Sequence, residues 1–180
     1  MAASDAAASA STRGANGAIF DASGAYRYAL WRTWDPRRPG VCFVMLNPSA
    51  ADATRDDPTI RRCLGFARSW GFGALHVVNL FAFRAAAPRA LKAASDPVGP
   101  DNDGFLAAAS ASADLLVAAW GNHGIFAGRA ASVVRDLLLA GREPLCLGRT
   151  RTTGEPRHPL YVPRGARPVP LLPEGGAACA

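Results

Sequence analysis

The stretch Gly40–Ser49, with the sequence GVCFVMLNPS, constrains the fold of this chain more than any other. Its apolar run, Val41–Met45, is unbroken and is stopped by Asn47-Pro48. A short apolar run bounded by turn-forming residues is typical of a strand buried on both faces, as at the centre of a parallel sheet. Pro48 cannot continue such a strand, so Asn47 should lie at its carboxyl end, where ligands bind in open α/β sheets.

The rest of the chain alternates between predicted strands and helices. Further strands are predicted over 74–80, 114–120 and 144–147, and helices over 58–70, 101–112 and about 125–140. Residues 18–20 and 26–31 flank a turn and predict an N-terminal hairpin. The pattern indicates an α/β protein, expected to be a three-layer αβα sandwich with a mainly parallel four-stranded sheet in the order 2-1-3-4, plus the hairpin.

At 180 residues the chain suits one domain, placed at 18–167. Residues 1–17 are expected to be a flexible tail, because they lack the basic and apolar regions of a signal peptide. Residues 168–180 are rich in Pro and Gly and predict a second tail. The Arg-rich segment 148–167 has no long apolar run, so we expect it to be either disordered or held against a ligand.

The charge of the chain favours a polyanionic partner. The net charge is +6, and all but one of the 20 basic residues are Arg, the side chain that stacks on bases and binds phosphate in a bidentate manner. Coding bias towards Arg explains the same composition, and both interpretations stay open. No apolar run is long enough to span a membrane.

The cysteines predict a reducing compartment. Cys42, Cys63, Cys146 and Cys179 show no C-x-x-C or Cys/His spacing, so we expect reduced thiols in a cytoplasmic protein, with no zinc or iron–sulfur site and no cofactor.

The predicted strand order creates a switch point. The first and third strands lie side by side with diverging loops, which should bring residues 46–49 next to residues 120–123 around a pocket. The loop after the second strand, with Asn79, Phe81 and Phe83, should lie on one side, and the loop around His158 should close over the top.

The order of these motifs resembles the uracil-DNA glycosylase superfamily. The chain has N-P after the first strand, V-N-L-F-A-F-R after the second, A-W-G-N after the third and H-P in a late basic loop. More closely, residues from about 26 to 162 resemble a bacterial and phage family catalogued as a domain of unknown function, with the signature L-N-P-S, D-D-P-T-I-R-R-C, N-L-F-A-x-R, A-W-G and H-P-L-Y. The first resemblance implies a glycosylase-like fold and a nucleobase pocket.

The glycosylase resemblance also implies roles for two residues. The Asn47 amide would hold the attacking water, and His158 would donate a hydrogen bond to the departing base. Leu160 and Tyr161 depart from the superfamily, which usually has Ser-Pro there. Leu160 is either a wedge that fills the space left by a flipped base or an anchor of its loop to the core. Asn47 has a plainer explanation as a turn residue before proline.

Other candidates follow from position. Asp52 and Asp56 are the carboxylates near Asn47 that could act as a general base, since Asp57 is explained as a helix cap. Candidate phosphate or DNA contacts are Arg84, Arg151, Arg157, Leu160 and Tyr161. Candidate base-binding residues are Leu46, Pro48, Ser49, Asn79, Phe81, Phe83, Trp120, Gly121, Asn122 and His123. The alternative for the aromatic residues is the core, and for the arginines a solvated surface.

Three functions fit these patterns. The first is a monomeric, uracil-DNA-glycosylase-like protein that binds a nucleobase in DNA and hydrolyses its N-glycosidic bond. The second is a nucleic-acid or nucleotide binding module without turnover, and the third is an enzyme that acts on a free nucleotide.

Overall fold

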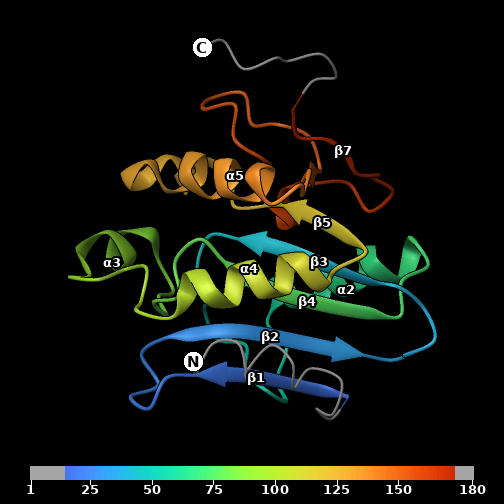
Figure 1. Cartoon of the computed structure of the whole chain (residues 1–180), viewed down its shortest axis with the longest axis horizontal. Helices are drawn as coiled ribbons and strands as arrows, with labels where there is room; N and C mark the ends of the chain where they lie inside the picture. The colour runs from blue at the N-terminus through green and yellow to red at the C-terminus, as the bar shows by residue number, and fades with distance from the viewer. Residues whose placement is uncertain (1–14, 173–180) are drawn as a thin grey trace.

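The computed structural model describes residues 15–172, which form one seven-stranded sheet in the order β1-β2-β4-β3-β5-β6-β7 (Figure 1). The strands are β1 (Asn16–Phe20), β2 (Arg27–Thr33), β3 (Gly40–Met45), β4 (Ala74–Asn79), β5 (Leu115–Ala118), β6 (Leu145–Cys146) and β7 (Val169–Pro170). β1 begins two residues before the predicted start of the domain. Residues 1–14 of the predicted N-terminal tail lie outside the described residues.

The predicted order of the parallel strands is confirmed. β4, β3, β5 and β6 are neighbours in that order and all three pairings between them are parallel. The sheet has seven strands rather than the four predicted, however, and it is mixed rather than mainly parallel. The hairpin of β1 and β2 does not stand apart but extends the sheet, because β2 pairs antiparallel with β4, and β7 pairs antiparallel with β6 at the other end.

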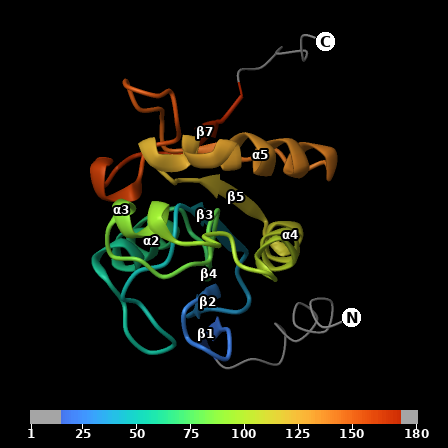
Figure 2. The same ribbon diagram turned by 90° about the vertical axis from the view of Figure 1, so that its left-hand side faces the viewer.

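Helices cover both faces of the sheet. Helix α2 (Pro58–Ser69) lies on one face and α4 (Asn102–Ser112) on the other (Figure 2). On β3, Cys42 and Val44 pack in the core on the α4 side and Val41 and Phe43 in the core on the α2 side, as expected of a strand buried on both faces. The short α3 (Pro88–Ala93) follows β4, and α5 (Arg129–Leu139) joins the core on the α4 side.

The helix predicted over 125–140 is two elements. A 3₁₀ segment, η2 (Asn122–Gly128), precedes α5. Ala127 and Gly128 have φ values of 54° and 66°, and such left-handed residues cannot continue a right-handed helix. The break leaves residues 122–128 as a turn next to the end of β5.

The C-terminal part is more ordered than the sequence predicted. Val169 and Pro170, at the start of the predicted tail, form β7, and Leu171 is buried in the core. The rest of that tail, 173–180, lies outside the described residues. The Arg-rich segment 148–167 is folded against the protein itself, where Val162 is buried and η3 (Pro159–Tyr161) packs on α2. The alternative that this segment is disordered was therefore wrong, whereas its contact with a ligand stays a prediction.

Residues 15–172 contain no helix with the length and apolar character needed to cross a membrane.

Candidate functional site

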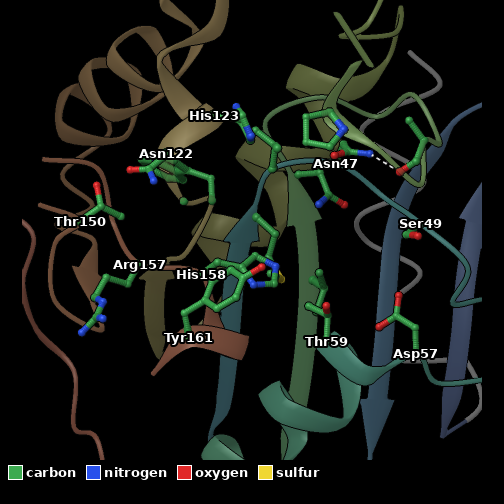
Figure 3. A pocket seen from close by; sticks show the side chains of 18 of the residues that line it. Asn47, Ser49, Asp57, Thr59, Asn122, His123, Thr150, Arg157, His158 and Tyr161 are labelled. Carbon is green, nitrogen blue, oxygen red and sulfur yellow. Dashed lines mark hydrogen bonds between the residues drawn. The ribbon is translucent and has the colours of Figure 1, made fainter. Parts of the chain in front are cut away.

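One cavity of about 880 Å³ opens at the carboxyl ends of β3, β4 and β5. Figure 3 shows side chains from four separate segments around it: Asn47 after β3, Asp57 and Thr59 at the start of α2, Asn122 and His123 after β5, and His158 and Tyr161 in the C-terminal loop. The strand order explains why these four segments lie around one cavity, because the loops that follow the neighbouring strands β3 and β5 diverge at the switch point. The predicted pocket is therefore present, and Asn47 and His158 both line it.

The Asn47 side chain is held in one orientation by two backbone carbonyls. Its Nδ2 donates to the oxygens of Pro48 at 2.9 Å and Ala85 at 2.8 Å. Both partners are acceptors, so the amide nitrogen must face them. The Oδ1 atom is left as an acceptor at the wall of the cavity, able to take a hydrogen bond from water or from an N–H group of a ligand.

His158 presents the opposite polarity. Its Nδ1 accepts from the backbone N–H of Leu160 at 3.4 Å, so in the neutral ring the proton lies on Nε2, a donor. Burial lowers the pKa of His158, and the Asp57 carboxylate offsets part of that effect. The ring packs beside Tyr161, with 5.8 Å between ring centroids. The cavity thus contains a neutral imidazole donor and a fixed amide acceptor.

The loop that carries His158 is anchored on both sides. Gly121, with φ of 74°, donates its N–H to Pro156 O at 2.8 Å, and a Cβ on Gly121 would lie 3.4 Å from the His158 Cβ. On the other side, Arg62 of α2 donates to the carbonyls of Pro159 and Val162. These contacts with β5 and α2 hold His158 over the end of β5.

Arg27 is a cavity residue that the sequence analysis missed. It begins β2, and because β2 runs antiparallel to β4, its first residue lies at the carboxyl edge of the parallel strands. The register between β1 and β2 shifts from Ile19 opposite Ala29 to Phe20 opposite Arg27. Such irregularities redirect side chains. Only 3% of Arg27 is exposed.

Asp57, rather than Asp52 or Asp56, is the carboxylate that lines the cavity. Its Oδ1 caps α2 by accepting from the N–H of Ile60 at 2.9 Å, as predicted, but the side chain also lines the cavity. Asp56 instead pairs with the buried Arg32 at 2.8 Å, and Asp52 accepts the N–H groups of its own loop. Neither lines the cavity, so their predicted role does not fit where they lie.

Most of the other predicted residues line the cavity, and a few do not. Those that do are Leu46, Ser49, Asn79, Trp120, Gly121, Asn122, His123, Arg151, Arg157 and Tyr161. Phe81 is fully buried in the core against Phe126, and Phe83 is half-buried and packs against Tyr26 at the edge of the core. Pro48 is buried and not in the lining.

Two of the predicted DNA contacts lie outside the cavity. Arg84 donates to Gly24 O at 2.9 Å and stacks over Phe20 on the N-terminal hairpin. Leu160 is 44% exposed, which contradicts the anchor alternative, because its neighbours Pro159 and Val162 are buried instead. Leu160 as a wedge stays a prediction.

Further lining residues escaped the sequence analysis. Besides Arg27 and Asp57 they are Met45, Thr59, Ile60, Val77, Ala85, Ala86, Pro88, Arg149, Thr150 and Thr152. The D-D-P-T motif, which joins a cap to the start of α2, was the signal for Asp57 and Thr59, since the start of that helix faces the carboxyl edge of β3. No local pattern pointed to Arg27.

Comparison with known proteins places the chain in a family. The family model described as "Protein of unknown function (DUF1643)" matches residues 27–160, most of the chain. The chain belongs to the DUF1643 family. The match includes every residue that lines the cavity except Tyr161, from Arg27 in β2 to His158, so the cavity belongs almost entirely to the DUF1643 domain. No curated protein and no solved structure matches this DUF1643 protein. The predicted membership of a family of unknown function is confirmed, and no link to the uracil-DNA glycosylases is shown.

Proposed function

We propose that this DUF1643 protein binds a nucleobase, within DNA or a nucleotide, and hydrolyses its N-glycosidic bond. The observation that carries the proposal is the pairing of a fixed acceptor, Asn47 Oδ1, with a neutral donor, His158 Nε2–H, in one cavity. The volume of about 880 Å³ lies within the range of small-molecule sites.

The chemistry follows from these two groups. Asn47 Oδ1 accepts a hydrogen bond from a water that attacks the anomeric carbon, and the C–N bond to the base breaks. The electron pair of that bond moves onto the base, where His158 Nε2–H stabilises the developing charge by a hydrogen bond to a carbonyl oxygen. Asp57, whose second oxygen accepts no hydrogen bond from the described residues, takes the water proton. An amide is no base, so Asn47 contributes by positioning.

The compartment and assembly belong to the same proposal. The buried cysteines Cys42, Cys63 and Cys146 are free thiols, which fits a reducing cytoplasm. We take the protein to act as a monomer.

The test is abasic-site formation. The purified protein is incubated with single- and double-stranded oligonucleotides that contain uracil, hypoxanthine or hydroxymethylated bases. Alkali then cleaves the oligonucleotides at any abasic site, and the cleaved fraction is measured. Asn47→Ala and His158→Ala should each lower the rate at least a hundredfold, whereas Arg37→Ala, on an exposed side chain away from the cavity, should not. Product formation that survives both cavity substitutions would refute the mechanism.

The alternative function is binding without turnover. The observation that favours it is the basic character of the cavity lining, with Arg27, Arg149, Arg151 and Arg157 against Asp57. Salt-sensitive binding of the same oligonucleotides without any abasic product would support that alternative.

A further inference from the structure

Arg27 carries a buried charge that the Asp57 carboxylate offsets only in part. Its Nη1 donates to Ala51 O at 2.8 Å, but Nε is enclosed without any acceptor, and Nη2 has no hydrogen bond to the described residues. No acidic side chain within residues 15–172 forms an ion pair with it. Burying a cation without a partner is costly, and native proteins usually pair such groups.

The surroundings of Arg27 add positive charge. Arg149, Arg151 and Arg157 line the same cavity, and Asp57 is the one acidic residue among its described lining residues. The amino-terminal end of α2, which carries Thr59 and Ile60 into the lining, adds the partial positive charge of a helix dipole. Burial lowers the pKa of Arg27 only to about 10, so the guanidinium is charged at neutral pH.

From these observations we infer that Arg27 is the anion-binding residue of the cavity and that the ligand places a phosphate group against its guanidinium. This inference rests on the proposed function and narrows its substrate class to a phosphate-bearing nucleotide, held with its phosphate inside the cavity. Arginine suits this role because its planar fork donates two parallel hydrogen bonds to phosphate oxygens.

The experiment compares ligands that differ only in phosphate. Binding of nucleosides and of the matching 5′- and 3′-nucleoside monophosphates is measured by calorimetry for the wild type, Arg27→Met and Arg27→Lys. Wild type should bind a monophosphate at least tenfold more tightly than the nucleoside. Arg27→Met should abolish that difference, and Arg27→Lys should retain part of it, since the charge remains without the fork. Arg37→Met, which removes an exposed arginine, is the matched control.

Two outcomes would overturn the inference. One is equal affinity of wild type for nucleoside and monophosphate, which would leave the proposed nucleobase function intact. The other is an Arg27→Met variant that keeps the full preference for the monophosphate.

A second probe separates this inference from the proposed function. Inorganic phosphate at constant ionic strength should raise the Tm of wild type and not that of Arg27→Met, even if no nucleobase binds; an equal rise in both would overturn the inference. The ligand-free Tm of Arg27→Met should equal or exceed that of wild type, because the substitution removes a buried charge that forms no ion pair with the described residues. If the methionine variant does not fold, the same phosphate titration is made with Arg27→Lys, which should show a smaller rise in Tm than wild type.

Discussion

The orientation of the Asn47 amide can be tested by Asn47→Asp, a change of one atom. In the wild type, Nδ2 donates to Pro48 O at 2.9 Å and Ala85 O at 2.8 Å. In the variant, a carboxylate oxygen would face the same two carbonyl oxygens, so two hydrogen bonds are lost and replaced by repulsion. This repulsion should raise the pKa of the new carboxyl above the ordinary value for aspartate.

The magnitude follows from the two lost hydrogen bonds. Each contributes about 1 kcal/mol, and a carbonyl left without a donor costs about 1–3 kcal/mol more. Pro48 O keeps the N–H of Ala85 at 3.0 Å, and the Asn47 side chain is half-buried, so the cost falls in the lower part of this range. We expect Asn47→Asp to lower the free energy of unfolding by about 2–3 kcal/mol at pH 7, a fall in Tm of roughly 4–12 °C for a chain of this size.

The raised pKa also sets how the stability of Asn47→Asp depends on pH. A folded-state pKa above the unfolded one means that the folded variant binds more protons, so its stability relative to wild type is lost as pH rises through the raised pKa. At pH 4 the protonated carboxyl can donate to one carbonyl again, and the deficit should shrink.

Urea unfolding at pH 4 and pH 7 measures the loss of stability of Asn47→Asp at each pH. Asn47→Ala is the control, because it removes the same two hydrogen bonds without adding a charge. If Asn47→Asp is as stable as wild type at pH 7, or if its deficit matches that of Asn47→Ala at both pH values, the amide does not face the two carbonyls and Oδ1 does not face the cavity.

Two further predictions concern stability. Asp56→Ala should lower the free energy of unfolding by about 2–3 kcal/mol. This is less than the full cost of breaking a buried pair, because the Asp56 side chain is 27% exposed while that of Arg32 is 6% exposed. Urea unfolding checks the value, with Asp52→Ala as the control, and a loss under about 0.5 kcal/mol would show that the ion pair does not stabilise the fold. Burial lowers the pKa values of His158 and His76 below the ordinary 6.5, so the unfolded state takes up protons first and stability should fall as pH drops below 6.5. His158→Gln should flatten that slope, and an unchanged slope would contradict the burial of its imidazole.

Local sequence patterns predicted the position of a residue correctly where that position depends only on its neighbours in the chain. Asn47 follows an apolar run stopped by proline, so its place at a strand end could be predicted without knowing any partner. Asp57 was correctly predicted as a helix cap from Asp-Pro, because a cap involves residues only three apart. The prediction failed where it asked which carboxylate reaches the cavity, since that depends on how α2 is placed against the sheet.

The sequence by itself determined the α/β class and the place of Asn47 at the end of a central strand, because hydrophobic periodicity and proline stops are set by the chain's own chemistry. The order of the four parallel strands was predicted because 2-1-3-4 is a common order of small doubly wound sheets, and it places the cavity at the carboxyl edge. Only the tertiary structure decided that the hairpin extends the sheet and brings Arg27 to that edge, and that the basic loop folds onto β5 and α2. Those contacts join residues far apart in sequence, through backbone hydrogen bonds and packing that leave no periodic signal.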